Sequence, residues 1–425
     1  MSKFVVRGGN ELNGQIYING SKNSALAVLA GTVLVSRGVS RIDNVPDISD
    51  VRFFLKILES LGAKISFVGH GVTVDASDIR SEAIPAELMG KLRGSILLAG
   101  PLLSRFGSVR FEKPGGDAIG SRPIDVHLDG FRKLGAEVRE NEAIEISGKL
   151  LGTKLVLSVS SVTGTENLIM AAVLAGGTTE ICMAATEPHV QDLCNFLNAA
   201  GAKIIGVGTP TLQITGVGSL SAPSTVFHLC ADEIETITFC VAAAATRGEV
   251  TLHNVNLKNV DAPLATLERM GVKFVCHAGP DANSGQIQIL KSAEPYRATK
   301  IVTGVFPQLL TDEQPLLGVL ATQAEGETFI HDWIYEGRQG YLRALAQMGA
   351  KVAFDDVHRA RITGPTPLHG AEIVTADLRA GASILIASAV ATGESIIYNA
   401  EIIDRGYERL DERLNSLGAS IERTN

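Results

Sequence analysis

The phrase Leu61-Gly62-Ala63-Lys64-Ile65 recurs in closely similar form along the whole chain of 425 residues. Each copy has an apolar residue, a glycine, a second apolar residue, a variable position and a β-branched or aromatic residue. The glycines of the six copies are Gly62, Gly135, Gly201, Gly271, Gly349 and Gly418. They are separated by 73, 66, 70, 78 and 69 residues, and this regular self-similarity indicates a fold built from one repeated unit.

Each copy predicts the end of a helix and the start of a strand. Apolar residues between Val51 and Leu61 recur at steps of three and four, which is typical of an amphipathic helix. We expect Gly62 and its five equivalents to be left-handed C′ caps, each followed at once by a strand.

A second helix is predicted upstream of each phrase, followed by a glycine and another strand. These helices are rich in small apolar residues on all sides, so we expect them to be buried. They fall near residues 25–34, 95–103, 168–174, 239–245, 315–321 and 383–391. Each unit of ~70 residues is thus helix, strand, loop, helix, strand.

The length of the chain exceeds that of one typical core, which favours two α/β domains with three units each. An open solenoid of six units is the alternative. We prefer two compact domains because the chemically interesting residues gather where the helices begin, and helix N-termini attract anions.

Bulk composition excludes several classes of function. A net charge of −8 argues against general affinity for nucleic acid or anionic membranes. The N-terminus lacks the apolar core of a signal peptide, and the apolar run from Ala25 to Val35 is too short to span a bilayer. Five cysteines without CxxC spacing are expected as buried, reduced thiols in a cytoplasmic protein.

Residues 114–123 form a glycine-rich segment that holds one carboxyl group, Asp117, and one guanidinium, Arg122. Glycines let backbone amides approach a ligand closely, so the segment suits an anionic substrate that gains or loses a proton. A glycine-rich surface turn is the alternative. Beyond the segment, Asp125 and His127 alternate around Val126, and we expect both to face a cleft beside Arg122.

Charged and hydroxyl side chains stand at the predicted starts of the buried helices. Lys22 and Arg93 open two of them, and Ser161 opens a third, where helix capping alone is an equal interpretation. Asp232, Asp312 and Asp377 open the helices of the second half, where acids are ordinary partners of the helix dipole. Nearby loops carry Arg338, Arg379 and Arg405, which predict one convergent anion pocket.

Taken together, these residues resemble the enolpyruvyl transferases over essentially the whole chain. The marks are Ser21-Lys22-Asn23, residues 114–127, Ser161-Val162, Thr165-Glu166-Asn167, Thr311-Asp312, Glu336, Arg338, residues 376–380 and residues 403–408. The resemblance implies two inside-out α/β domains, each with three units related by pseudo-threefold symmetry. It places one domain at residues 22–230, with the catalytic loop 114–123, and the other at residues 1–21 plus 231–425. The active site is then expected in the cleft between the domains.

The same resemblance implies transfer of the enolpyruvyl group of phosphoenolpyruvate to the 3′-hydroxyl of UDP-N-acetylglucosamine, with release of phosphate, in peptidoglycan precursor synthesis. We expect no cofactor, no metal ion and a monomer. Asp312 matches the proposed base at the sugar hydroxyl, and Asp117 matches the general acid. Lys22, Arg122 and Arg405 match residues around the phosphate, and Arg338 and Arg379 match residues near the substrate carboxylate. The further substrate-binding positions implied are Asn23, Arg93, Pro123, Ile124, Asp125, Val126, His127, Ser161, Val162, Ile334 and Asp377.

Four departures from the family pattern stand out. Most members carry cysteine, the target of the epoxide antibiotic fosfomycin, where this chain has Asp117. A carboxyl group donates a proton only while it is protonated, which we expect mainly in the complex with anionic substrate. Glu233, Val159 and Ile402 replace a common arginine, lysine and histidine. The acceptor could therefore be shikimate 3-phosphate or another nucleotide, and a catalytically silent binding homologue is a further alternative.

Overall fold

The computed structural model describes residues 2–80, 84, 86–112, 115 and 119–424. The chain divides into two compact units. Unit 1 comprises residues 1–19, 117–121 and 231–425, and unit 2 comprises residues 20–116 and 122–230. Among the described residues, no helix combines the length and hydropathy needed to cross a membrane.

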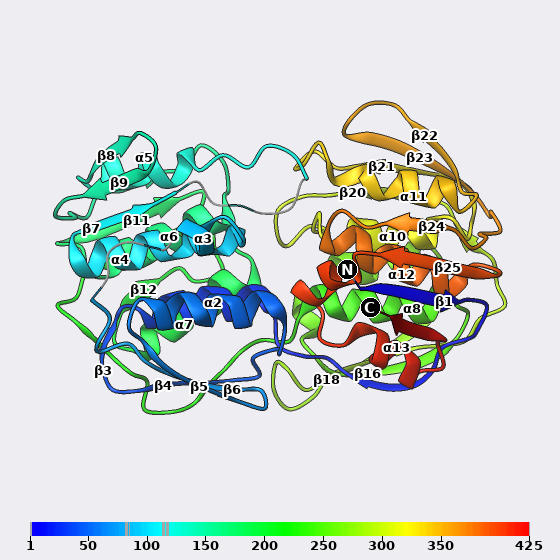
Figure 1. Ribbon diagram of the computed structural model, residues 1–425, viewed down its shortest axis with the longest axis horizontal. Coiled ribbons are helices and arrows are strands. Elements are labelled where there is room, and N and C mark those ends of the chain that lie inside the picture. Colours follow the sequence, from blue (N-terminus) through cyan, green and yellow to red (C-terminus); the bar gives the residue numbers. More distant parts are fainter. Residues whose placement is uncertain (1, 81–83, 85, 113–114, 116–118, 425) are drawn as a thin grey trace. The chain divides into compact units, whose positions relative to one another are not determined.

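Unit 2 contains three helix–strand repeats (Figure 1). Its elements are α1 (Lys22–Thr32), β3 (Val35–Arg37), β4 (Ser40–Asp43), α2 (Ser49–Ser60), β5 (Lys64–Val68), β6 (Gly71–Asp75), α3 (Ala86–Met89), η1 (Arg93–Leu98), α4 (Ala99–Phe106), β7 (Ser108–Phe111), α5 (Asp125–Lys133), β8 (Glu137–Glu140), β9 (Ile144–Ser147), β10 (Lys154–Val156), α6 (Val162–Val173), β11 (Thr178–Cys182), α7 (Pro188–Ala199), β12 (Lys203–Ile205), β13 (Thr211–Thr215), β14 (Leu220–Ser221) and β15 (Phe227–His228).

Unit 1 also contains three repeats. Its elements are β1 (Lys3–Arg7), β2 (Asn13–Tyr17), α8 (Glu233–Ala245), β16 (Glu249–Val255), η2 (Leu257–Asn259), α9 (Asp261–Arg269), β17 (Phe274–His277), β18 (Gly285–Ile289), β19 (Tyr296–Arg297), β20 (Lys300–Val302), α10 (Gln314–Ala321), β21 (Ala324–His331), η3 (Arg338–Gly340), α11 (Tyr341–Gln347), β22 (Lys351–Phe354), β23 (Arg359–Gly364), β24 (Glu372–Val374), α12 (Leu378–Val390), β25 (Glu394–Tyr398), η4 (Ala400–Arg405), α13 (Leu410–Ser416) and β26 (Ile421–Thr424).

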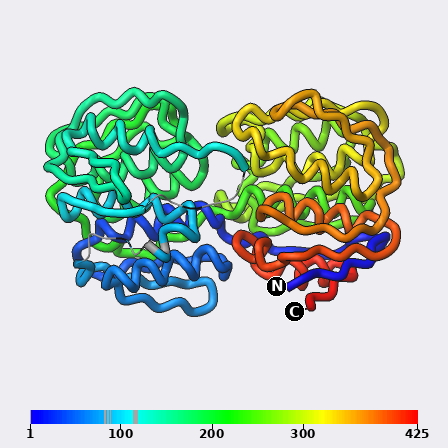
Figure 2. Tube along the Cα trace, turned by 45° about the horizontal axis from the view of Figure 1, so that its top comes forward, coloured from blue at the N-terminus to red at the C-terminus, as the bar shows by residue number. Residues whose placement is uncertain are grey.

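One sheet pattern is repeated in both units. The strand after the inner helix pairs antiparallel with a middle strand, which pairs with the strand after the glycine phrase, as in β4-β6-β5 and β11-β13-β12. A parallel strand, such as β15 or β10, is added at the other edge. In the last repeat β1 supplies the middle strand, between β25 and β26, so the chain's first strand lies beside its last (Figure 2).

The six glycine caps and the inner helices of unit 1 are confirmed. Gly62 and its five equivalents all have φ between 87° and 109°, and a strand begins two or three residues later. In unit 1 the inner helices α8, α10 and α12 contact one another and are almost entirely buried, as their all-round apolar composition predicted. The three inner helices therefore form the centre of unit 1, and its sheets pack around them.

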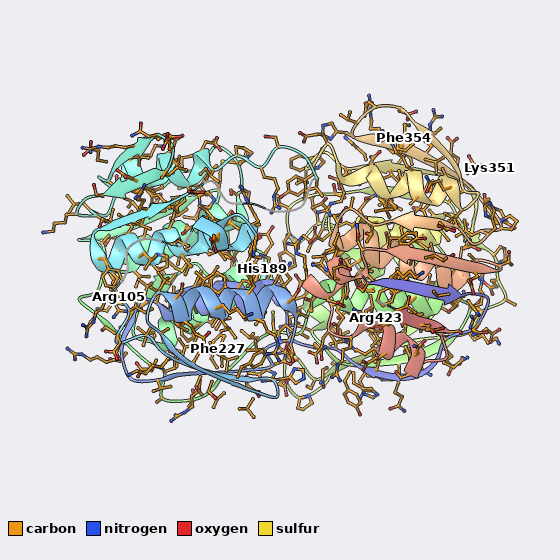
Figure 3. All side chains as sticks on the ribbon, viewed as in Figure 1. Arg105, His189, Phe227, Lys351, Phe354 and Arg423 are labelled. Atoms are coloured by element: carbon orange, nitrogen blue, oxygen red, sulfur yellow. The ribbon has the colours of Figure 1, made fainter. Side chains whose placement is uncertain are left out.

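The corresponding helices of unit 2 differ in detail from the sequence prediction. The stretch predicted near residues 95–103 is split into η1 and α4, with Gly100 close to the backbone of Asn167 on α6. Arg105 at the end of α4 donates hydrogen bonds to the carbonyls of Val33 (2.8 Å) and Ala76 (2.7 Å), which ties α4 to the first repeat (Figure 3).

The prediction of uniformly buried thiols is wrong. Cys194, Cys230 and Cys240 are buried, but Cys276 on β17 is exposed and Cys182 at the end of β11 is partly exposed. Both strands have an outward face, which local apolar composition does not reveal.

Candidate functional site

The first inner helix of unit 2 begins with a buried lysine. Ser21 is the N-cap of α1, and its hydroxyl accepts a hydrogen bond from the amide of Ser24 (3.4 Å). Lys22 follows and is 8% exposed, with its Nζ 2.8 Å from Oδ2 of Asp50 on α2. Lys22 is therefore held by a partner within the unit, and Asp50 was not identified from the sequence. Asn23, the next residue of α1, is half-buried.

Arg93 connects η1 to the segment that carries Arg122. Its guanidinium donates hydrogen bonds to the carbonyl oxygens of Arg122 and of Pro123 (3.3 Å). The two carbonyls are thereby fixed directly before α5, which begins at the exposed Asp125. The structure thus brings three of the predicted site residues, Arg93, Arg122 and Pro123, together, with Ile124 directly after them.

The predicted alternation of Asp125 and His127 is wrong, because these residues belong to a helix rather than to extended chain. His127 is 1% exposed and lies on the buried face of α5. Oδ1 of Asn167 accepts a hydrogen bond from the Gly100 amide (2.6 Å), which fixes the orientation of the side-chain amide. Its Nδ2 therefore donates hydrogen bonds to Ile96 O (2.8 Å) and to His127 Nδ1 (2.9 Å). His127 Nε2 then carries the proton toward Thr163 Oγ1, 3.2 Å away.

Burial, with a smaller contribution from Arg93, lowers the pKa of His127 to about 3. The imidazole is therefore neutral near pH 7, and its two nitrogens are used in joining α5 to α6. Val126 lies on the same turn and would contact a Cβ placed at Gly164, which shows how closely the two helices approach.

Ser161 caps α6, and its predicted hydrogen bond to a ligand stays a prediction. Its hydroxyl accepts a hydrogen bond from the amide of Gly164 (3.2 Å), and Val162 is the first helical residue. The helices α5 and α6 pack against each other. The first carries Val126 and His127, and the second begins at Ser161 and Val162.

In unit 1 the three inner helices all have acidic N-caps. Asp232 accepts a hydrogen bond from the amide of Glu235 (2.8 Å), and Asp377 accepts from the amides of Arg379 (2.9 Å) and Ala380 (3.0 Å). Glu313 occupies the N-cap position of α10. Because α8, α10 and α12 pack together, these caps belong to one neighbourhood (Figure 1).

The Asp312 carboxylate forms ion pairs with two buried arginines. Its Oδ1 accepts a hydrogen bond from Arg338 Nη2 (2.6 Å), and its Oδ2 accepts from Arg379 Nε (3.1 Å). Both arginines are 4% exposed. Arg338 and Arg379 thus meet at the Asp312 carboxylate, and Asp377 lies beside them with its Oδ1 3.8 Å from Arg338 Nη1. The predicted anion pocket of three arginines stays a prediction.

A chain of hydrogen bonds orients this cluster from behind. Arg338 Nε donates to Thr311 Oγ1 (3.2 Å), which donates to Asp332 Oδ2 (2.6 Å). Asp332 is fully buried, and its Oδ1 accepts from the amides of Ile334 (3.1 Å) and Tyr335 (3.2 Å). The half-buried Ile334 is thereby tied to the arginine cluster.

Arg405 ends η4, which packs against α12. A Cβ at Gly381 of α12 would lie 2.8 Å from the side chain of Ile403, so helix and turn are in close contact. Whether Arg405 joins Arg338 and Arg379 on one anion stays a prediction.

Glu336 holds the far end of the glycine-rich segment. Its Oε1 accepts a hydrogen bond from the amide of Ser121 (2.9 Å), and the amide of Gly337 donates to Ile119 O (2.9 Å). The hydrogen bond from the Ser121 amide lowers the pKa of the Glu336 carboxyl. Gly120 has φ 123°, and a Cβ there would lie 2.6 Å from Glu336 Oε2, so the position requires glycine. Asp117, the predicted general acid, lies outside the described residues.

Comparisons with known proteins agree with this architecture. The sequence profile of EPSP synthase (3-phosphoshikimate 1-carboxyvinyltransferase) matches residues 6–414. The chain is 42% identical to the UDP-N-acetylglucosamine 1-carboxyvinyltransferase of Dichelobacter nodosus, covering 100% of this chain and 99% of that protein. It is 40% identical to the protein of the same name from Coxiella burnetii, covering 100% and 96%.

Solved structures show the same fold. The enolpyruvyl transferase NikO from Streptomyces tendae superposes with a TM-score of 0.88 at 27% identity, covering 100% of this chain and 99% of that one. EPSP synthase from Acinetobacter baumannii gives 0.79 at 20% identity, with both chains covered fully, and that likeness concerns the fold alone. The predicted fold class of three helix–strand units in each of two α/β parts is confirmed. The chain belongs to the EPSP synthase family of enolpyruvyl transferases.

Proposed function

We propose that this protein transfers the enolpyruvyl group of phosphoenolpyruvate to the 3′-hydroxyl of UDP-N-acetylglucosamine and releases phosphate. The names of relatives at 40–42% identity over the full length support this acceptor. The observation that carries the chemistry is the Asp312 carboxylate held between Arg338 and Arg379. Guanidinium pairs of this kind bind carboxylates, and phosphoenolpyruvate has one.

The ion pairs of Asp312 with Arg338 and Arg379 explain how Asp312 becomes an active base. While both guanidiniums bind Asp312, its ionised form is stabilised and it is a weak base. When the carboxylate of phosphoenolpyruvate takes over Arg338 and Arg379, Asp312 loses these partners and its affinity for a proton rises. Asp312 then accepts the proton of the sugar hydroxyl as the oxygen attacks C2 of phosphoenolpyruvate.

The remaining steps balance as an addition and an elimination. In the addition, the methylene carbon gains a proton, for which Asp117 is the proposed donor. In the elimination, the methyl group loses a proton and the bond from C2 to the phosphate oxygen breaks, releasing inorganic phosphate. Lys22, Arg122 and Arg405 are proposed to hold the phosphate, whose growing charge such preset cations stabilise.

This proposal makes residues 22–230 and residues 1–21 plus 231–425 act on one pair of substrates. Asn23, Arg93, Ser161 and Val162, with residues 123–127 and with Ile334 and Asp377, are proposed to contact or border the nucleotide sugar. For His127 the role is indirect, since its nitrogens are already used by Asn167 and Thr163. The enzyme is proposed to act in the cytoplasm as a monomer.

Phosphate release tests the proposal directly. The purified protein is incubated with phosphoenolpyruvate and, separately, UDP-N-acetylglucosamine, shikimate 3-phosphate or UMP, and the product is identified by mass spectrometry. We expect release only with UDP-N-acetylglucosamine. Release only with another acceptor would overturn the acceptor, and no release with any of them would favour a silent homologue.

The variant Asp312→Asn tests the base, because the amide keeps the shape but cannot accept the proton. Its matched control is Asp355→Asn directly after β22, which loses the same charge at a partly exposed ion pair with Arg361. We expect a fall in kcat of at least ~100-fold for Asp312→Asn only.

A further inference from the structure

Two glutamates behind Asp312 are buried without the partners that ionised carboxylates need. Glu233 is 2% exposed, and Glu313 is 1% exposed. Glu233 Oε1 and Oε2 and Glu313 Oε1 have no hydrogen-bond donor among the described residues, while Glu313 Oε2 accepts only the Leu310 amide (3.0 Å). The neighbouring Glu235 differs, because its Oε1 accepts from the Asn19 amide (2.9 Å) and from Arg413 (2.8 Å).

The surroundings of the pair contain more negative than positive charge. Glu233 opens α8 and Glu313 caps α10, two helices in contact. The charged groups that act on Glu313 are Asp312 on its own segment, Asp232 at the start of α8 and Arg379 on α12. Arg379 is already bound to Asp312. Ionising both glutamates would therefore add two buried negative charges beside a site that must accept an anion.

Protonation resolves this imbalance. Burial raises the pKa of Glu313 to about 8, with Asp312 and Asp232 adding to the rise and the Leu310 amide and Arg379 opposing it. Burial likewise raises the pKa of Glu233 well above its ordinary value, helped by Asp232 and Glu313. A protonated carboxyl also supplies an O–H donor, which this group of acceptors lacks.

We propose that Glu313, with Glu233 as its neighbour, is a positioning residue that is kept as an uncharged acid so that the Asp312–Arg338–Arg379 cluster can accept the carboxylate of phosphoenolpyruvate. Glu313 acts through these residues and does not touch the reacting atoms. The inference rests on the proposed function. The sequence marked Glu233 only as a replacement of a common arginine, and it gave no indication of a role for Glu313.

The test is the pH dependence of kcat/KM for phosphoenolpyruvate in Glu313→Gln, whose amide stays neutral at every pH. In the unmodified protein, ionisation of Glu313 makes kcat/KM fall above pH 8, by about tenfold for each pH unit. We expect Glu313→Gln to lose this fall or to shift it upward by at least one pH unit. The control Glu268→Gln, at an exposed position on α9, keeps the fall. A purely structural role would lower activity equally at every pH.

An infrared measurement on the substrate-free protein keeps the proposal testable if Glu313→Gln folds poorly. Burial also raises the pKa of the Glu166 carboxyl, so the measurement uses Glu166→Gln as the parent protein. At pH 7 we expect this parent to show the carbonyl band of a protonated carboxylic acid, which weakens toward pH 9 and is reduced when Glu233→Gln is added. A parent protein without such a band, or an unchanged alkaline fall in Glu313→Gln, would overturn the proposal. Absence of turnover with every acceptor would instead refute the proposed function, because the infrared result does not depend on it.

Discussion

Acidification is expected to destabilise unit 2 through His127. The imidazole is 1% exposed and its pKa is lowered from 6.5 to about 3, mainly by burial. The folded state therefore binds the proton less readily than the unfolded chain. Stability from this group is complete above pH 6.5 and is lost progressively as the pH falls from 6.5 toward 3.

The size of the effect follows from the two pKa values. At pH 5, which lies about 1.5 units below the pKa of the unfolded histidine, protonation of His127 stabilises the unfolded chain by about 2 kcal/mol. The folded chain, with a pKa of about 3, gains almost none of this free energy. The variant His127→Gln cannot take up this proton, and its amide can still bond to Asn167 or Thr163. We expect a lower free energy of unfolding at pH 7.5 but a smaller loss between pH 7.5 and pH 5.

Urea unfolding at both pH values, followed by far-ultraviolet circular dichroism, measures this difference. The control is His277→Gln, at an exposed position on β17 of unit 1, which should keep the full pH dependence. Trp333, the single tryptophan, lies in unit 1, so its fluorescence reports on that unit separately. If His127→Gln loses as much free energy of unfolding as the unmodified protein does, the account of His127 as a buried neutral base is wrong.

Three further outcomes are expected. Arg338→Lys cannot bind a carboxylate through two parallel N–H groups, so kcat/KM for phosphoenolpyruvate should fall by roughly 10- to 100-fold in steady-state kinetics, and an unchanged value would remove Arg338 from the anion site. Asp117→Asn should abolish most turnover, and near-normal turnover of this variant would refute the acid role. Asp117→Cys should make the protein sensitive to covalent inactivation by fosfomycin, seen as a mass increase. Gly318→Ala places a Cβ 2.0 Å from Tyr341 Oη and should lower the free energy of unfolding by about 1–3 kcal/mol. Gly340→Ala, whose Cβ has no neighbour within 4 Å among the described residues, should be neutral or slightly stabilising, and equal effects of the two variants would contradict the packing argument.

Residues 119–123, which follow the proposed acid, are anchored at two points. Glu336 and Gly337 hold residues 119 and 121 within unit 1, whereas Arg93 holds Arg122 and Pro123 within unit 2. The boundary between the units thus runs through the segment that the sequence singled out for chemistry. Glycine composition alone could not locate the two anchors, because both come from residues remote in sequence.

The sequence alone determined the six repeated units, their left-handed glycine caps and the inner helices, except that the helix predicted near residues 95–103 is split into η1 and α4. These features are local, since helix periodicity and caps are encoded within some 15 residues. It also located Asp312, Arg338 and Arg379 at helix starts and loops, because anion sites recur at such positions.

Only the tertiary structure decided which side chains meet. The pairing of Lys22 with Asp50, the double grip on Asp312, the burial of Glu233 and Glu313 and the place of β1 inside the last repeat all depend on how separate helices and strands pack. The same is true of His127, whose surroundings come from α6 and η1 rather than from its own segment. Contacts between residues far apart in the chain leave no local period in the sequence, so packing alone sets their distances, charges and protonation.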